Sequence, residues 1–291
     1  MQTIDPVALR DALRGVRALL LDLDGVVVVA GKAVPGSVDA INELERRAVP
    51  YRIVTNTSLV SRATLSRFAA KLGNDIPPGR FQSALSASAA FAAQSFPGQP
   101  IYVISSADAR TEFDGQQLLS HAEAARPGAR AAAVIVGDSP EELTHANLNQ
   151  AFRLIRGGAR LIGMHRNPWW LTPDGPTLDS GAYVTGLEFA TGTRAQIIGK
   201  PSAAFFSIAI EGLRRDLAAG GTRLRRSEIG MVGDDIRTDV LAGQRAGLRG
   251  VFVLTGKHQL DDLIRRPGHG RGGREPHAVA PSLAEVVAAL D

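Results

Sequence analysis

Two aspartates end the first apolar run of the chain, in the segment LLLDLDGVVVV (19–29), where Asp22 and Asp24 follow a run of leucines. An apolar run of this kind is typical of a buried strand. A buried carboxylate costs several kcal/mol unless a cation or hydrogen-bond donors compensate its charge. The two aspartates therefore predict a cation at the end of this strand.

Polar residues also follow three other short apolar runs. They are Thr55 and Asn56 after YRIV, Lys200 after QIIG, and Asp234 and Asp235 after IGMVG. In a parallel sheet, ligands bind at the carboxyl ends of the strands. Carboxylate oxygens, a backbone carbonyl and waters form the octahedral oxygen set that Mg²⁺ prefers, and Lys200 adds a second positive charge. The combination predicts a site for a divalent cation and an anion.

Each of these residues also has a purely structural interpretation. An aspartate at the end of a strand commonly caps a helix or forms a turn, so Asp235 and Asp239 could cap a helix that starts at 238. Thr55 and Asn56 could cap a loop, and Lys200 alone would be read as a surface lysine. The joint occurrence of DLDGV, TN, GKP and GDD-x₃-D in this order favours a functional site.

The elements that must position these residues alternate between strand and helix, which is typical of a parallel sheet covered by helices. Near the two ends of the chain we expect strands at 17–24, 51–56, 195–200, 228–235 and 248–256, and helices at 37–48, 61–73, 202–217, 238–247 and 282–290. The middle of the chain has its own alternation, with strands at 100–105, 129–137 and 159–168, a long helix at 140–158, and a returning segment at 180–192. The simplest layout is an α/β core domain from residues 1–82 and 193–291 with an α/β insertion at 83–192.

Composition excludes several classes of protein. The chain has 291 residues, of which 44% are hydrophobic and 21% charged, as in ordinary globular proteins. Without cysteine it has no disulfide and no thiolate metal site. The N-terminus lacks a signal-peptide layout and no apolar stretch reaches the ~20 residues of a membrane span, so we expect a cytoplasmic protein without a membrane partner. The arginines at 223–226 and 265–274 lack interleaved aromatic residues and are interpreted as solvated loop rather than a nucleic-acid surface.

The four motifs resemble the signatures of the haloacid dehalogenase superfamily of phosphohydrolases. Longer stretches, among them TNTSLVSRATL, LNQAFRLIRGGARLIGMHRNP and MVGDDIRTDVLAGQRAGLRGVFVLTGK, are similar to its class IIA, NagD-like branch. Within that branch, the likeness is greatest to the group of haloacid-dehalogenase-like hydrolase domain-containing protein 2 and of phospholysine phosphohistidine inorganic pyrophosphate phosphatase. The resemblance covers roughly residues 15–260.

This resemblance implies a Rossmann-like core and an inserted cap of the C2 type. It also implies a role for each motif residue: Asp22 as nucleophile, Asp24 as general acid and base, Thr55, Asn56 and Lys200 as phosphate ligands, Asp22, Asp234 and the backbone carbonyl of Asp24 as Mg²⁺ ligands, and Asp235 and Asp239 as supporting residues. Substrate specificity is expected in the cap, with His165, Arg166 and Asn167 as candidates.

The predicted function is a Mg²⁺-dependent phosphatase that hydrolyses small phosphorylated metabolites through an aspartyl phosphate. A dehalogenase would have no use for Mg²⁺ or for Asp24. Two alternatives stay open, namely a catalytically weak phospho-ligand binding protein and a phosphatase for pyrophosphate or phosphoamino acids. Trp169 and Trp170 could contact a substrate ring or form a homodimer interface through the cap.

Overall fold

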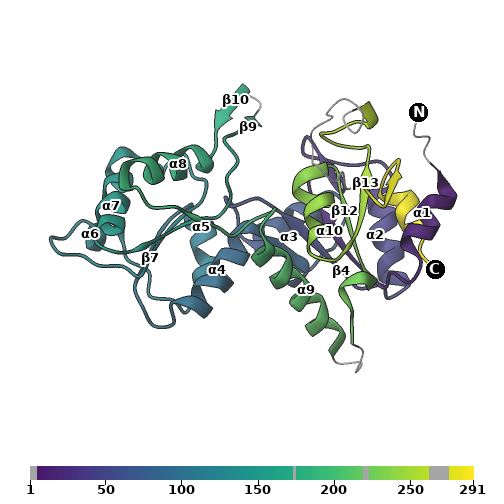
Figure 1. The fold of residues 1–291 in the computed structure, drawn as a ribbon, viewed down its shortest axis with the longest axis horizontal. Helices are drawn as coiled ribbons and strands as arrows, with labels where there is room; N and C mark the ends of the chain where they lie inside the picture. Colours follow the sequence, from purple (N-terminus) through teal and green to yellow (C-terminus); the bar gives the residue numbers. More distant parts are fainter. Residues whose placement is uncertain (1–4, 173–174, 219–222, 262–274) are drawn as a thin grey trace. The chain divides into compact units, whose positions relative to one another are not determined.

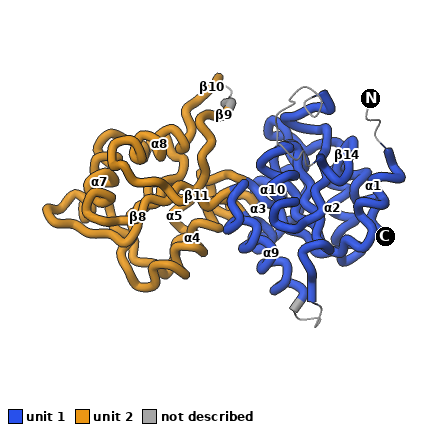
Figure 2. The backbone as a smooth tube through the Cα atoms, viewed as in Figure 1, with its two compact units in different colours: residues 1–55, 66–82, 200–291 blue, residues 56–65, 83–199 orange. Residues whose placement is uncertain are grey.

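The computed structural model describes residues 5–172, 175–218, 223–261 and 275–291. The chain divides into two compact units, coloured separately in Figure 2. The first unit contains residues 1–55, 66–82 and 200–291, and the second contains residues 56–65 and 83–199. The arginine- and glycine-rich segment 265–274 of the sequence analysis lies outside the described residues.

A six-stranded sheet with the order β14-β13-β12-β1-β4-β5 forms the centre of the first unit. β1 is flanked by β12 and β4 and pairs with both in parallel, so that Leu21 lies beside Val232 on one side and Ile53 on the other. Because these strands run in the same direction, their carboxyl ends share one edge of the sheet. The strands are β1 (Ala18–Asp22), β4 (Tyr51–Thr55), β5 (Phe81–Ser83), β12 (Ile229–Gly233), β13 (Arg249–Val253) and β14 (Ala278–Ala280).

Helices flank this sheet (Figure 1), and a small hairpin follows β1 in the sequence. The hairpin consists of β2 (Val28–Val29) and β3 (Lys32–Ala33). The helices are α1 (Pro6–Leu13), α2 (Ser37–Arg46), α3 (Arg62–Lys71, which begins in the second unit), η1 (Pro78–Arg80), α9 (Ala203–Ala218), η3 (Arg226–Glu228), the π turn η4 (Ile236–Val240), α10 (Leu241–Arg245) and α12 (Leu283–Ala288).

The second unit has its own four-stranded sheet with the order β11-β8-β7-β6, and all of its neighbours pair in parallel. Its strands are β6 (Ile101–Ile104), β7 (Ala133–Val136), β8 (Arg160–Gly163) and β11 (Gln196–Ile197), and β9 (Trp169–Thr172) and β10 (Gly175–Leu178) form a separate antiparallel hairpin. Its helices are α4 (Ala84–Ser95), α5 (Ala107–Arg110), η2 (Thr111–Phe113), α6 (His121–Ala124), α7 (His145–Arg156) and α8 (Ser180–Thr191).

The α/β class, with parallel strands flanked by helices, is confirmed. One predicted helix is too long, because residues 140–158 contain only α7, whose N-cap Thr144 accepts a hydrogen bond from the amide of Asn147. The short strand expected at 195–200 is present as β11, but it pairs with β8 in the sheet of the second unit. Among the described residues, none of the helices combines the length and apolar character needed to cross a lipid bilayer.

Candidate active site

Asp22 is the last residue of β1 and is only 6% exposed. The apolar residues 18–21 before it are fully buried, so the strand leads directly from the core to this carboxylate. Asp22 Oδ1 accepts a hydrogen bond from the backbone N–H of Leu23 at 2.8 Å and another from Lys200 Nζ at 2.6 Å. The buried carboxylate is therefore compensated in part by one lysine.

Lys200 joins two acidic side chains that are far apart in the sequence. Its ammonium group lies 2.6 Å from Asp22 Oδ1 and 2.8 Å from Asp239 Oδ1, and it also donates to the carbonyl oxygen of Val54 at 3.4 Å. Burial disfavours its charge, but the two carboxylates outweigh this effect and raise the pKa of Lys200 above its usual value. Lys200 is therefore a buried, permanent cation in the site.

Asp22, Asp234 and Asp239 form a cluster in which each offers an oxygen, and these oxygens all lie within 4.8 Å of one another. All three side chains are buried. One lysine cannot balance three carboxylates, so the cluster carries excess negative charge. Carboxylate oxygens at this spacing are what a hard divalent cation such as Mg²⁺ requires. The donor set of this site fits the predicted metal.

The crowding of buried negative charge also raises the pKa values of the three carboxylates. Burial, followed by the charge of Asp234 and of Asp24, raises the pKa of Asp22 to about 6 against the opposing effect of Lys200. Burial raises the pKa of Asp234 to about 6 as well, and that of Asp239 well above its usual range. A divalent cation would favour the ionised form of all three carboxylates.

Asp234 lies in a cradle that only glycine permits. A Cβ atom on Gly25 would lie 2.2 Å from the Asp234 carboxylate, and one on Gly256 would lie 2.0 Å from its Oδ2. Oδ2 also accepts the backbone N–H of Lys257 at 2.6 Å, and the hydroxyl of Thr255 donates to the carbonyl of Gly25 at 2.5 Å. The sequence analysis did not include the segment 255–257 among the site residues, although it lies just after the end of β13 at Val253 and could have been found by the same rule about strand ends.

Asp235 and Asp239, which the sequence analysis treated together, have different surroundings. Asp235 caps the π turn η4 by accepting the backbone N–H groups of Arg237 and Thr238, and it pairs with Lys257 Nζ at 3.0 Å. Burial alone would raise its pKa, but these hydrogen bonds and Lys257 lower it to about 2. Asp239 is fully buried against Lys200. The capping interpretation therefore describes Asp235, whereas Asp239 belongs to the charged cluster.

Asp24 and Thr55 complete the site within the first unit. Asp24 is exposed, whereas Thr55 is buried. The surrounding protein atoms and the charge of Asp239 raise the pKa of Asp24, against the opposing effects of Lys200 and of a hydrogen bond from Thr55. Asn56 belongs to the second unit, where its side-chain oxygen lies close to Gly199. The first unit thus holds all of the predicted core residues except Asn56.

The three residues predicted to set specificity all lie in the second unit, just after β8. His165 is only 2% exposed and hydrogen bonded to Ser58 at 2.9 Å, whereas Arg166 and Asn167 are exposed. Arg166 forms a two-point ion pair with Glu188 at 2.9 and 2.6 Å. Their contact with a substrate stays a prediction.

Comparison with known proteins identifies the family to which this site belongs. A family profile described as haloacid dehalogenase-like hydrolase matches residues 19–118, and one described as HAD-hydrolase-like matches residues 197–286. The bovine (Bos taurus) haloacid dehalogenase-like hydrolase domain-containing protein 2 is 36% identical over 276 residues, which cover 94% of this chain and 98% of the relative. The human phospholysine phosphohistidine inorganic pyrophosphate phosphatase is 32% identical, with 86% of this chain and 87% of the relative covered.

Solved structures of similar fold include phosphatases. The p-nitrophenyl phosphatase from Archaeoglobus fulgidus has a TM-score of 0.81 and 25% identity, covering 94% of this chain and 99% of its own. NagD from E. coli K-12 has a TM-score of 0.78 and 26% identity, covering 93% of this chain and 98% of its own. On its sequence identity, its fold and its buried carboxylate cluster, the chain belongs to the haloacid dehalogenase-like hydrolases, in their class IIA, NagD-like branch.

Proposed function

We propose that the protein is a Mg²⁺-dependent phosphatase that hydrolyses small phosphate monoesters through an aspartyl phosphate on Asp22. One observation carries the proposal: a buried aspartate at the end of the central strand β1 is held by Lys200 within a cluster of three converging carboxylates. This arrangement places the Asp22 carboxylate beside the positive charge of Lys200 and beside carboxylates that would hold a divalent cation. The names of relatives and neighbours, which include several phosphatases, support the same reaction class.

Asp22, Asp234 and the backbone carbonyl of Asp24 would hold the metal, which when bound cancels negative charge between nucleophile and phosphate. Lys200 provides a second, permanent positive charge for the phosphoryl oxygens, and Thr55 and Asn56 would add hydrogen-bond donors. Lys200 is held by Asp22 and Asp239 before the substrate arrives, so its charge needs little reorganisation as charge moves in the transition state.

In the first step, a carboxylate oxygen of Asp22 attacks phosphorus in line while the bond to the leaving oxygen breaks. Asp24 donates its proton to that oxygen, which leaves as an alcohol. In the second step, Asp24 accepts a proton from water as the water oxygen attacks phosphorus, and the bond to Asp22 breaks to release inorganic phosphate. The raised pKa of Asp24 suits a residue that must hold a proton in one step and accept one in the next.

Release of inorganic phosphate by the purified protein tests this proposal. We expect hydrolysis of p-nitrophenyl phosphate with Mg²⁺, loss of activity with a chelator and recovery when Mg²⁺ is returned. Absence of phosphate release from any member of a panel of phosphorylated metabolites, together with binding of those compounds, would instead support the phospho-ligand binding alternative. Preferred hydrolysis of pyrophosphate or phosphoamino acids would favour the other alternative, which the name of the human relative supports. The cytoplasmic location stays a prediction.

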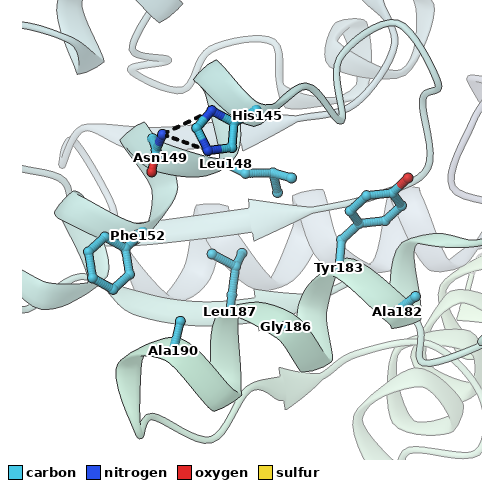
Figure 3. Close-up of a pocket in the computed structure, with 9 residues that line it drawn as sticks. All are labelled: His145, Leu148, Asn149, Phe152, Ala182, Tyr183, Gly186, Leu187 and Ala190. Atoms are coloured by element: carbon cyan, nitrogen blue, oxygen red, sulfur yellow. Dashed lines mark hydrogen bonds between the residues drawn. The ribbon is translucent and has the colours of Figure 1, made fainter.

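The second unit contains an apolar groove that is unsuited to this chemistry. It lies between α7 and α8, has a volume of about 440 Å³ and is lined by side chains such as Leu148, Phe152 and Leu187 (Figure 3). Its most polar pair is His145 and Asn149, which hydrogen bond to each other at 3.3 Å. None of the lining residues carries a carboxylate, a lysine or an arginine. The groove therefore offers an apolar surface rather than a phosphate site.

We also propose that the protein forms a homodimer through the second unit. Trp169 and Leu178, which pair across the β9–β10 hairpin, are 58% and 61% exposed, and Phe189 on α8, one of the two helices beside the groove, is 91% exposed. Apolar surface of this kind is typical of protein interfaces. Light scattering should give twice the chain mass, and Phe189→Asp should give the monomer mass. A wild-type protein that stays monomeric at high concentration would refute the proposal.

A further inference from the structure

A second group of buried polar side chains lies in the second unit and supplies none of the groups that react in the proposed mechanism. It follows the carboxyl ends of β6, β7 and β8 and includes side chains from α8 and the loop after β4. None of its members is more than 7% exposed, and they are Ser58, Ser105, Asp138, His165, Asp179 and Ser180. Buried polar groups are costly unless they are hydrogen bonded, so a network of this size has a structural or functional reason.

His165 is at the centre of this network. Its Nδ1 accepts the backbone N–H of Asn167 at 3.3 Å, which leaves the proton of the neutral ring on Nε2. Nε2 lies 2.9 Å from the hydroxyl of Ser58 and 3.2 Å from that of Ser180. Burial lowers the pKa of His165 to about 4, so the ring stays neutral near physiological pH. His165 therefore acts as a neutral hydrogen-bond donor between α8 and the loop after β4.

Ser58 holds that loop against the second unit. Its hydroxyl accepts the backbone N–H of Asp138 at 2.9 Å in addition to its contact with His165, and its carbonyl accepts the hydroxyl of Ser105 at 3.0 Å. The loop continues to Ser61, whose backbone N–H donates to Asp108 at 2.7 Å. The segment 56–61 is thus tied to the second unit along its length.

Met164, the residue before His165, holds the segment that ends at Gly199. The carbonyl of Met164 accepts the backbone N–H of Gly199 at 2.7 Å. A Cβ atom on Gly199 would lie 2.6 Å from that carbonyl oxygen and 2.7 Å from the side-chain oxygen of Asn56. Asn56 and Gly199 therefore approach each other closely within the second unit, and only glycine fits at position 199. Met164 and His165 together fix both segments.

Asn56 and Gly199 are covalently bonded to residues of the active site. Thr55 precedes Asn56 and Lys200 follows Gly199, and both Thr55 and Lys200 belong to the first unit. We propose that His165 is a positioning residue of the phosphatase reaction, which holds Ser58 and, through its neighbour Met164, Gly199, and so fixes the chain just after Thr55 and just before Lys200. This inference rests on the proposed function but assigns His165 no contact with the substrate.

The proposal predicts that substitutions in this network lower activity by the same factor for every substrate. Thr55 and Lys200 would hold the phosphoryl group, which all substrates share, and a displacement of about 1 Å can cost roughly 100-fold in rate. We expect His165→Leu and Ser58→Ala each to lower kcat/KM by roughly 10- to 100-fold, equally for p-nitrophenyl phosphate and an alkyl phosphate, and to weaken inhibition by inorganic phosphate. The double variant should lose little more than either single variant, because both remove the same contact.

Two further variants separate positioning from general loosening of the unit. His165→Gln keeps a side-chain N–H at similar reach and should recover most of the activity. His121→Leu makes the matched change at another histidine of the second unit, where it removes contacts to Tyr102 at 2.8 Å and to Glu142 at 2.5 Å, and it should leave kcat/KM unchanged. A loss with His121→Leu as large as with His165→Leu would overturn the proposal. So would losses that differ between substrates with different leaving groups, since these would indicate substrate contact.

Hydrogen exchange gives a readout that does not need activity. Backbone amides in 56–61 and 198–200 should exchange faster in His165→Leu or Ser58→Ala than in the wild type and in His121→Leu. If the wild-type protein releases no phosphate, the proposed function fails, whereas this exchange pattern still tests the positioning network. If His165→Leu does not fold, Ser58→Ala carries both measurements. Unchanged exchange in these segments would overturn the proposal.

Discussion

Both units gather polar side chains at the carboxyl edge of a parallel sheet, but they compensate them differently. In the first unit, three carboxylates converge to within 4.8 Å and share one lysine. In the second unit, the backbone N–H of Asp138 donates to the hydroxyl of Ser58, Asp179 Oδ1 accepts the backbone N–H of Ser180, and His165 is neutral. The first arrangement gathers three carboxylates closely enough to hold a cation, whereas the second consists mainly of hydrogen bonds between neutral groups around His165. This contrast separates a site for chemistry from a network for positioning.

The largest effect is expected for Asp22→Asn. The amide cannot attack phosphorus, so turnover of p-nitrophenyl phosphate should fall by at least about 10⁴-fold with the fold intact by circular dichroism. The equivalent change in the second unit, Asp179→Asn, should cost no more than roughly 100-fold, as for the other substitutions in that network, because it removes no reacting group. Comparable losses in the two variants would contradict the distinction between the units, and retained turnover in Asp22→Asn would refute its role as nucleophile.

The next largest loss of activity is expected for Asp24→Asn, and its size should depend on the leaving group of the substrate. An alkoxide needs a proton to leave and p-nitrophenolate does not, so an alkyl phosphate should lose about 10²- to 10³-fold and p-nitrophenyl phosphate less than about 10-fold in kcat. The same two substrates should respond equally to Ser58→Ala, which makes that variant the control. Equal losses on both substrates in Asp24→Asn would argue against an acid role.

The sequence predicts the site of the first unit better than the network of the second unit, and the reason is physical. The residues Asp22, Thr55, Lys200 and Asp234 each follow an apolar run, and parallel topology then brings strand ends together. That rule needs no knowledge of side-chain direction, so the α/β fold could be predicted and the candidate residues of the core could be chosen. The distinct surroundings of Asp235 and Asp239 could not be predicted, because they depend on the π turn η4, which Asp235 caps and which contains Asp239.

In the second unit, the sequence offers weaker signals. Ser58 and His165 are 107 positions apart, and neither type of residue in isolation indicates a buried contact. Residues 196–197 form a strand as expected, but nothing local to them shows that they pair with β8. Pairing partners and hydrogen-bond networks between distant loops depend on tertiary packing, which a pattern along one chain does not encode.

Mg²⁺ should raise the thermal stability of the protein through the carboxylate cluster of the first unit and not through the second unit. A ligand that binds only the folded state at a hundredfold excess over its dissociation constant stabilises it by about 2.7 kcal/mol, or roughly 5–10 °C for a protein of this size. We expect this shift by calorimetry in the wild type and in Ser58→Ala, but not in Asp234→Asn. Tryptophan fluorescence should report a smaller shift, because both tryptophans, Trp169 and Trp170, lie in the second unit. An equal shift in Asp234→Asn would place the cation elsewhere.

The smallest expected effect is a pH dependence of the unfolding free energy that arises from His165 in the second unit. Because burial lowers the pKa of His165 to about 4, the unfolded chain binds a proton near the usual histidine pKa while the folded chain does not. The contribution of this histidine to stability is therefore fully present above about pH 6.5 and is lost as the pH falls toward 4, by about 2 kcal/mol on going from about pH 7.5 to about pH 5. His165→Gln cannot titrate and should not show this loss. Asp138, whose raised pKa of about 6 acts in the opposite direction, is common to both proteins and cancels from the difference. Urea unfolding followed by tryptophan fluorescence measures that difference, and parallel pH profiles for the wild type and His165→Gln would mean that His165 is not held as a neutral donor.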